Sequence, residues 1–237
     1  MSEHSLIKPP LVVAGISLPH AAILAPMSGV TDLPFRRVVR RCGGGLVVTE
    51  MVASAAVLQQ VRSEMRKLKT AAVEEAPLSV QLAGWDPQTM AEAARLCEGL
   101  GATFIDINMG CPAKKVTGKL SGSALMRDPH LAAAIMHSVK SAVSVPVTLK
   151  MRLGWDENSL NAAEFGRIAE DTGLSMLAVH GRTRCQMYQG AADWKQIASV
   201  VDAVSIPVIA NGDIRCPDTA LQAIAASDAA GVMVGRG

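Results

Sequence analysis

The side chains of this sequence that can do chemistry lie at the ends of short apolar segments. Eight such segments each end in polar groups, and these are Ser28, Glu50, Gln81, Asn108 with Cys111, Lys150 with Arg152, His180 with Arg182, Asn211 with Asp213, and Arg236. Amides supply paired donors and acceptors that suit the edge of a planar heterocycle, and the cations supply fixed positive charge. This set predicts a binding site for a planar ring that carries a phosphate.

Cys111 is the strongest candidate for a reactive group. Before it, Gly110 relaxes the backbone, and after it, Pro112 fixes the direction in which the chain continues. A thiol holds its proton at neutral pH, so we expect Cys111 to act as a proton donor rather than as a nucleophile. The usual role of a cysteine is that of a small buried hydrophobe, and we assign that role to Cys97.

The apolar segments alternate with stretches of helical periodicity, which indicates a repeated βα unit. We predict strands at residues 22–27, 46–51, 78–84, 104–110, 147–153, 176–182, 208–213 and 231–236. Eight strands that alternate with helices predict an α/β protein with a closed (β/α)8 TIM barrel rather than an open sheet. Because the carboxyl ends of barrel strands converge on one mouth, the polar residues at those ends are expected to meet there.

Capping signals mark several of the helices. Asp86 and Asp128 are each followed by proline and a periodic apolar stretch, Gly101 stops the first of these helices, and Asp218 starts another. Residues 1–20 are predicted to form an N-terminal arm whose hairpin closes the bottom of the barrel, or alternatively an unstructured arm. The sequence stops directly after the last predicted strand, so we expect a barrel domain over 21–237 that lacks its last helix.

Composition excludes several classes of protein. The chain is 49% hydrophobic with 20 glycines, which suits strands buried on both faces. Its 23 basic and 21 acidic residues leave a net charge of +2, so any contact with RNA must come from local patches. Five widely spaced cysteines without a CxxC pair argue against disulfides or a metal site and favour a reducing cytoplasm. No apolar run reaches the roughly 20 residues of a membrane span, so we expect no membrane partner.

Four motifs, in this order on the predicted strands, resemble the bacterial tRNA-dihydrouridine synthases, most closely the B-type branch. They are APMSGVTD (25–32), DINMGCP (106–112) with KKV (114–116), HGRT (180–183) and ANGD (210–213). The resemblance covers the chain from about residue 11 to its end. It implies an FMN-binding TIM barrel that uses NADPH to reduce the 5,6 double bond of particular uridines in tRNA.

The resemblance also implies roles for individual residues. Cys111 would protonate C5 of the uracil while a hydride reaches C6. The cofactor-binding residues would be Pro26, Met27, Ser28, Gln81, Lys150, His180, Asn211, Gly212, Asp213, Gly235 and Arg236. The substrate-binding residues would be Asn108, Lys114, Lys115 and Arg182. His180 stays open between two roles, because a cationic imidazole suits a phosphate and a neutral one suits a carbonyl.

Basic clusters offer contacts for tRNA phosphates. They comprise Lys114, Lys115 and Lys119 after the cysteine, and Arg36, Arg37, Arg40 and Arg41 on the first predicted helix. The synthases that this sequence resembles carry a further C-terminal helical domain that binds tRNA, and we expect this chain to lack it.

Two other functions remain open. One is an FMN barrel that reduces a free pyrimidine or an enoate, and the other is a barrel that binds RNA or flavin without turnover. Visible absorption by bound flavin separates a flavoprotein from a barrel that binds only RNA.

Overall fold

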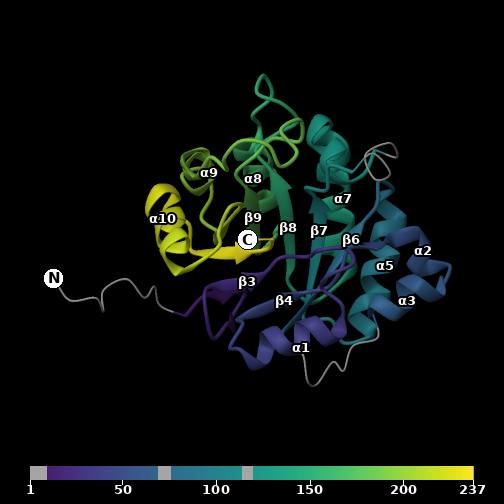
Figure 1. The fold of residues 1–237 in the computed structure, drawn as a ribbon. Helices are drawn as coiled ribbons and strands as arrows, with labels where there is room; N and C mark the ends of the chain where they lie inside the picture. The colour runs from purple at the N-terminus through teal and green to yellow at the C-terminus, as the bar shows by residue number, and fades with distance from the viewer. Residues whose placement is uncertain (1–9, 69–75, 114–119, 237) are drawn as a thin grey trace.

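The computed structural model describes residues 10–68, 76–113 and 120–236. Within these residues, eight parallel strands form a closed ring, as predicted (Figure 1). They are β3 (Ala22–Leu24), β4 (Leu46–Val48), β6 (Leu78–Ala83), β7 (Phe104–Met109), β8 (Val147–Arg152), β9 (Met176–His180), β10 (Val208–Asn211) and β11 (Gly231–Val234). The ring closes through two pairings, β3 with β11 and β4 with β6.

The predicted strands run past the observed ends by up to three residues, as with 22–27 against Ala22–Leu24. The backbone leaves the ladder where the mouth loops begin, and the polarity of those residues does not mark the exact exit point. Nothing in the sequence indicated β5 (Val52–Ala53), which pairs with the carboxyl end of β6.

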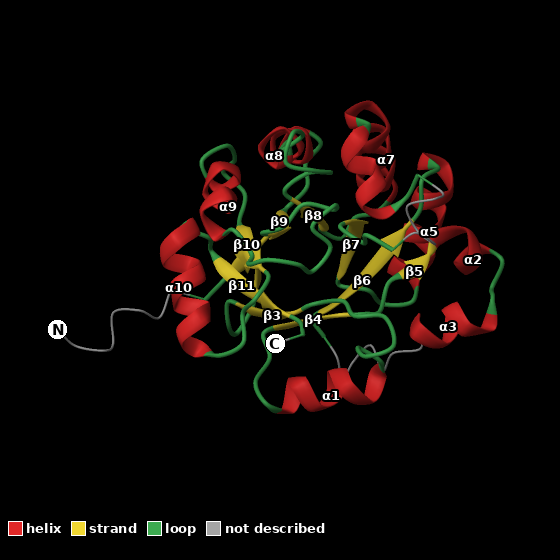
Figure 2. Ribbon diagram, turned by 45° about the horizontal axis from the view of Figure 1, so that its top comes forward, coloured by secondary structure: helices red, strands yellow, loops and turns green. Residues whose placement is uncertain are grey.

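Helices surround the ring of strands (Figure 2). They are α1 (Leu33–Arg41), α2 (Ser54–Leu58), α3 (Arg62–Leu68), α5 (Pro87–Gly99), the 3₁₀ helix η2 (Gly122–Arg127), α7 (Pro129–Ala142), α8 (Ala162–Asp171), α9 (Trp194–Val201) and α10 (Pro217–Ser227). The predicted caps Asp86 and Asp128 accept hydrogen bonds from the amides of Thr89 and Leu131, at 2.8 and 3.0 Å. These two helix starts are confirmed.

The predicted start of α10 at Asp218 is wrong. The helix begins at Pro217, with Cys216 as its N-cap, and Asp218 lies inside the first turn. Proline fits the first helical position because its fixed φ suits a helix and its missing N–H would have no partner there.

The lower half of the barrel interior is lined mainly by apolar side chains. Inward side chains near the strand starts pack with Leu11, Val13 and Leu18 of the hairpin formed by β1 (Val12–Val13) and β2 (Ile16–Ser17). Those inward residues are Ile23, Leu46, Phe104, Met176 and Ile209. The hairpin therefore closes the amino-terminal end of the barrel, as predicted.

The upper half of the interior is polar. Alternate strand residues such as Ile105 and Ile107 pack outward in the cluster that contains the helices, so Asp106 and Asn108 between them face inward. The same alternation on β8 puts Leu149 outside and directs Lys150 into the barrel. The strands thus place an apolar plug at one end and polar groups at the other.

Candidate active site

Five buried or half-buried polar side chains meet at the carboxyl ends of neighbouring strands. They are Gln81 on β6, Asn108 on β7, Lys150 on β8, His180 on β9 and Asn211 on β10. Strand register pairs Asn108 with Lys150, and His180 with Asn211. Past the intervening strand β9, Lys150 Nζ donates to Asn211 Oδ1 at 3.0 Å. Residues predicted from separate motifs are therefore brought together at one end of the barrel.

Cys111 lies in a loop that hydrogen bonds hold on both sides. Asn108 Oδ1 accepts from the amides of Gly110 and Cys111 at 3.2 and 3.0 Å. The Cys111 carbonyl accepts from the amide and the hydroxyl of Ser123 at 3.1 and 2.9 Å. The half-buried thiol therefore sits on a fixed backbone directly after β7.

Lys150 is a buried amine whose environment disfavours its charge. Burial and the neighbouring charge of Arg152 together lower the pKa of Lys150 to about 8, although Asp106 and Cys111 act in the opposite direction. Asn108 pairs with Lys150, and a Cβ on Gly110 would lie 3.5 Å from the Lys150 carbonyl oxygen, so the loop of Cys111 and Lys150 lie on the same side of the molecule. Lys150 still carries a proton through most of the neutral range, and it gives it up more easily than an exposed lysine does.

His180 is neutral in this setting. Burial and, to a smaller extent, the charges of Lys150, Arg152, Arg182 and Arg236 together lower the pKa of His180 to about 2. The Arg182 Nη1 atom lies 3.3 Å from His180 Nε2. A guanidinium only donates, so Nε2 accepts and the ring proton belongs on Nδ1.

Arg152 ties two mouth loops together. Its buried guanidinium donates from Nε to the Gly110 carbonyl at 2.8 Å, and from Nη1 to the carbonyls of Thr183 and Met187 at 2.7 and 2.9 Å. Burial lowers the pKa of Arg152 to about 10, which leaves it charged at neutral pH. Sequence reasoning gave this residue no specific role, because the carbonyls that it binds come from loops far away in the chain.

Arg182 and Asp213 bind each other. Arg182 Nη2 lies 2.8 and 2.7 Å from the two carboxylate oxygens of Asp213, and also donates to the Gly190 carbonyl at 2.6 Å. Asp213 accepts a further bond from the Ala192 amide at 2.7 Å. The substrate role of Arg182 and the cofactor role of Asp213 stay predictions, and this geometry has both side chains already engaged in holding the β9–α9 loop.

The late glycine motifs approach other parts of the mouth closely. Gly212 has a φ of +109°, and a Cβ there would lie 2.8 Å from His180 Cδ2, so a side chain would displace the imidazole. A Cβ on Gly235 would lie 3.4 Å from the Ala25 Cβ and 3.7 Å from Met27 Sδ. The predicted cofactor residues of the first and last strands are therefore neighbours.

The turn after β3 is held in place as well. The Met27 amide donates to Thr31 Oγ1 at 3.0 Å, and the Gly29 amide donates to Glu50 Oε1 at 2.6 Å. Pro26 and Met27 are half-buried and Ser28 is exposed. Glu50, which the sequence shows only as a polar strand end, thus anchors this turn from the neighbouring strand.

Aromatic and cationic groups extend the site outward. The guanidinium of Arg236 lies 4.1 Å from the centre of the Tyr188 ring, and that of Arg152 lies 5.5 Å from it. On the neighbouring loops, Arg127 and Arg184 lie 4.9 and 4.7 Å from the centre of the Trp155 indole. Sequence analysis missed Tyr188 and Trp155, and only the arginines that follow the strands hinted at this patch.

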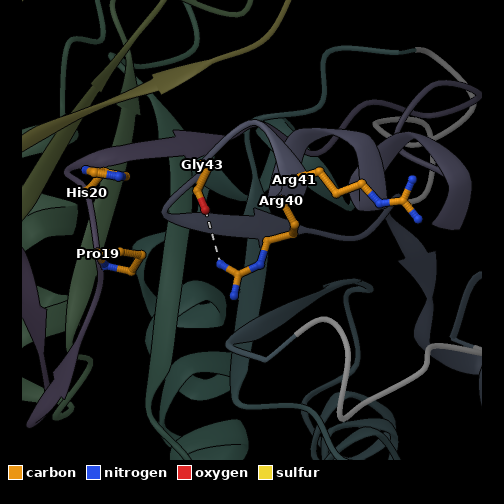
Figure 3. A pocket seen from close by; sticks show the side chains of 6 residues that line it. Pro19, His20, Arg40, Arg41 and Gly43 are labelled. Atoms are coloured by element: carbon orange, nitrogen blue, oxygen red, sulfur yellow. Dashed lines mark hydrogen bonds between the residues drawn. The ribbon is translucent and has the colours of Figure 1, made fainter.

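The predicted phosphate contacts on α1 are wrong for Arg36 and Arg40. Arg36 is fully buried and donates to the Thr31 carbonyl at 2.7 Å. Arg40 donates to the carbonyls of Gly44, Gly45 and Ala76, and it lines a hollow of about 400 Å³ with His20 (Figure 3). His20 precedes β3 and Gly44 precedes β4, so this hollow lies at the end of the barrel opposite the mouth.

The remaining basic cluster cannot be placed, since Lys114, Lys115 and Lys119 lie outside the described residues. Cys97 is buried on α5, as predicted, and burial raises its pKa to about 12. Among the described residues, no group of three or more histidine, cysteine, aspartate or glutamate side chains is arranged to hold a metal ion. No helix in the described ranges is long and apolar enough to cross a membrane.

Comparisons with known proteins agree with the motifs. The family model described as dihydrouridine synthase matches residues 23–237. The chain is 58% identical over 215 residues to a probable tRNA-dihydrouridine synthase of Rhodobacter capsulatus, covering 91% of this chain and 66% of that protein. It is 51% identical over 221 residues to tRNA-dihydrouridine synthase B of Pseudomonas aeruginosa, covering 93% of this chain and 66% of the relative.

The chain thus spans about two thirds of the length of these relatives. Among solved structures, a mandelate oxidase mutant with a monooxide FMN adduct matches with a TM-score of 0.61 at 20% identity, covering 97% of this chain and 69% of that one. At this identity the match shows the barrel fold alone.

Proposed function

Because the chain belongs to the dihydrouridine synthase family, we propose that it reduces the 5,6 double bond of uridines in tRNA, with FMN as cofactor and NADPH as reductant. One observation carries the proposal. A half-buried thiol, Cys111, lies on a fixed loop at the same mouth of the barrel as Lys150 and the neutral His180. We also propose a cytoplasmic location, where tRNA is available.

The charge and shape of the mouth fit FMN. Four cationic side chains lower the pKa of His180, and they are Lys150, Arg152, Arg182 and Arg236. Positive charge therefore collects around this residue, and an anionic phosphate would offset it. Gly212 and Gly235 keep the backbone there free of side chains. We assign the phosphate to Asn211, Gly212, Gly235 and Arg236. Pro26, Met27 and Ser28 would lie against the ring, and Gln81 and Lys150 at its edge.

When bound and reduced, FMN supplies a hydride. Lys150 is suited to the ring edge because a nearby negative charge restores the protonated form that burial disfavours. Neutral His180 can donate from Nδ1 to a phosphate or carbonyl oxygen, and it adds no charge of its own. His180 would therefore act as a neutral hydrogen-bond donor, whether its partner is a phosphate oxygen or a carbonyl oxygen.

Reduction of uracil adds a hydride at C6 and a proton at C5. In the proposed reaction, the S–H bond of Cys111 breaks and its proton goes to C5, which leaves a thiolate close to the positive charges of Lys150 and Arg152. Asn108 and Arg152 hold the loop that carries this thiol. A uracil stacked inside folded tRNA must leave the stack to reach the mouth, as in other enzymes that modify bases.

The test is direct reduction of RNA. The chain is incubated with FMN, NADPH and tRNA that lacks dihydrouridine, and the product is measured by mass spectrometry of nucleosides. NADH, free uracil and a simple enoate are tested in parallel. We expect dihydrouridine in tRNA only. Faster turnover of free uracil or the enoate, or FMN binding with no product from any substrate, would replace the proposal with one of the two other functions.

A further inference from the structure

A chain of buried hydrogen bonds leads from the middle of the barrel to the loop that carries Cys111. Thr148 Oγ1 donates to Asp106 Oδ1 at 2.6 Å, and Gln81 Nε2 donates to Asp106 Oδ2 at 2.7 Å. Asn108 Nδ2 then donates to Gln81 Oε1 at 2.7 Å, and Asn108 Oδ1 accepts the Cys111 amide at 3.0 Å. Asp106, Gln81 and Asn108 are 3%, 1% and 6% exposed, so water does not compete for these bonds.

The carboxylate sets the direction of each bond in this chain. A carboxylate oxygen accepts, so Gln81 must turn its Nε2 toward Asp106 and its Oε1 toward Asn108. Asn108 must then turn Nδ2 toward Gln81, which leaves Oδ1 for the backbone amides of the loop. Reversing the Gln81 amide would set its Oε1 against the carboxylate of Asp106 and its Nε2 against Nδ2 of Asn108, and would leave buried groups without partners.

Asp106 has no part in the proposed reaction. Burial raises its pKa, while the bonds from Thr148 and Gln81 and the charge of Lys150 favour the ionised form. A buried carboxylate is costly unless its oxygens are satisfied. Both oxygens of Asp106 accept hydrogen bonds, and one of those bonds begins the path to Cys111.

We propose that Asp106 is a positioning residue that orients Gln81 and, through Asn108, holds the loop of Cys111. The inference rests on the proposed function, in which Gln81 lies at the flavin edge and Cys111 is the proton donor. The relay is the chain of hydrogen bonds that runs from Asp106 through Gln81 and Asn108 to the Cys111 amide. Each of its two side-chain amides uses one N–H within the relay and has a second N–H. A second N–H that faces the mouth would suit a carbonyl oxygen of a flavin or a uracil.

The test reverses the polarity of one link and then restores it. Asp106→Asn keeps the shape but allows Nδ2 to face Gln81, so the amide of Gln81 loses its fixed orientation. In the double variant Asp106→Asn with Gln81→Glu, the carboxylate moves one step along the relay. It can accept from the new amide at position 106 on one side and from Asn108 on the other, so Asn108 recovers its orientation. Ser227→Ala is the matched control, because it removes a buried hydroxyl bonded to the Ala223 carbonyl at 2.6 Å, far from the relay.

Two measurements need neither flavin nor RNA. One is the alkylation rate of Cys111, read from its peptide by mass spectrometry. The other is hydrogen exchange at the amides of Gly110 and Cys111. We expect Asp106→Asn to change the alkylation rate by about fivefold and to speed amide exchange by about tenfold or more. The double variant should return both values to about twofold of the parent, and Ser227→Ala should leave both unchanged.

Parental values in folded Asp106→Asn, or altered values in the folded double variant, overturn the proposal. If Asp106→Asn does not fold, the proposal is tested by comparing Cys111 alkylation and amide exchange between the double variant and the parent. A parent whose Cys111 amide exchanges as fast as an exposed loop also overturns it. FMN affinity, measured next in each folded variant, should fall in Asp106→Asn. Because the loop is read without flavin or tRNA, failure of the relay is distinct from failure of dihydrouridine formation.

Discussion

The two ends of the barrel interior use the same strands for opposite purposes. At the lower end, Phe104, Met176 and Ile209 belong to one apolar cluster with the hairpin residues Leu11 and Leu18. At the upper end, the same strands, β7, β9 and β10, carry Asn108, His180 and Asn211. Only a few residues along each strand separate an apolar core from a polar, cationic mouth.

The difference teaches where stability and chemistry are placed. Apolar burial stabilises the lower end without directional requirements. The upper end buries amides and cations that must each find a partner, and the lowered pKa of His180 shows how strongly that environment disfavours further positive charge. Apolar packing at the lower end therefore offsets the cost of burying cations at the upper end. Those buried cations suit an anionic ligand.

The largest effect is expected from Cys111→Ala at the upper end. A general acid contributes roughly 10²- to 10⁴-fold to a rate, so dihydrouridine formation should fall by about that factor. Nucleoside mass spectrometry of treated tRNA measures it, and FMN binding should persist. Cys97→Ala is the control for loss of a thiol, because Cys97 is buried on α5 away from the mouth. Undiminished product from Cys111→Ala would remove the acid role.

At the lower end, Phe104→Ala should act on stability rather than on chemistry. Phe104 is fully buried beneath the mouth. Truncating a buried phenylalanine costs about 3–5 kcal/mol in the free energy of unfolding, which urea titration measures. Where the variant remains folded, its affinity for FMN should be close to that of the parent. A loss of FMN affinity larger than the loss of folded protein would show that the two ends are not separable.

Lys150→Met should weaken FMN binding. The change removes a buried cation and its hydrogen bond to Asn211 while keeping a side chain of similar length. Hydrogen bonds to charged groups are worth about 1.5–3 kcal/mol, so the Kd for FMN should rise about tenfold to a hundredfold. Fluorescence quenching of FMN gives the Kd. Lys195→Met, on the exposed surface of α9, should leave it unchanged and thereby exclude a general charge effect.

His180 should make the protein less stable in mild acid. Its folded pKa lies near 2, against an ordinary value of 6.5. Between these values the unfolded chain takes up a proton that the folded chain refuses, so stability is lost as pH falls below about 6.5. The slope approaches about 1.4 kcal/mol per pH unit, or about 2 kcal/mol by pH 5.

Urea midpoints at pH 7 and pH 5, compared between the parent and His180→Asn, isolate this contribution from that of other groups. The variant should lose less stability than the parent over this range. Equal losses in the two proteins would mean that His180 is not held neutral by the mouth.

The strands and their order could be predicted because period and punctuation are local properties of the sequence. The segment 104–110 is a short apolar stretch that ends at a glycine, and the structure has β7 at Phe104–Met109. The start of α10 was misplaced for a local reason too, since Asp218 is a good cap in general but Pro217 occupies the first helical position here. The meeting of the polar residues at one mouth could be predicted from the barrel topology alone.

The connections among those residues could not be predicted. Arg182 and Asp213 look like ligand-binding groups when each is considered alone, yet each binds the other across 31 positions of sequence. Arg36 looks like an exposed helix cation, yet it is fully buried. Side-chain partners depend on distances between loops, which periodicity and spacing do not encode.

Hydrogen exchange with and without FMN tests most directly whether the polar end of the barrel is the cofactor site. We expect FMN to slow exchange at residues 108–113, 180–183, 211–213 and 234–236, and to leave the hairpin at residues 11–18 unchanged. Protection around Pro19, His20 and Gly44 at the opposite end, with the mouth unaffected, would contradict the account.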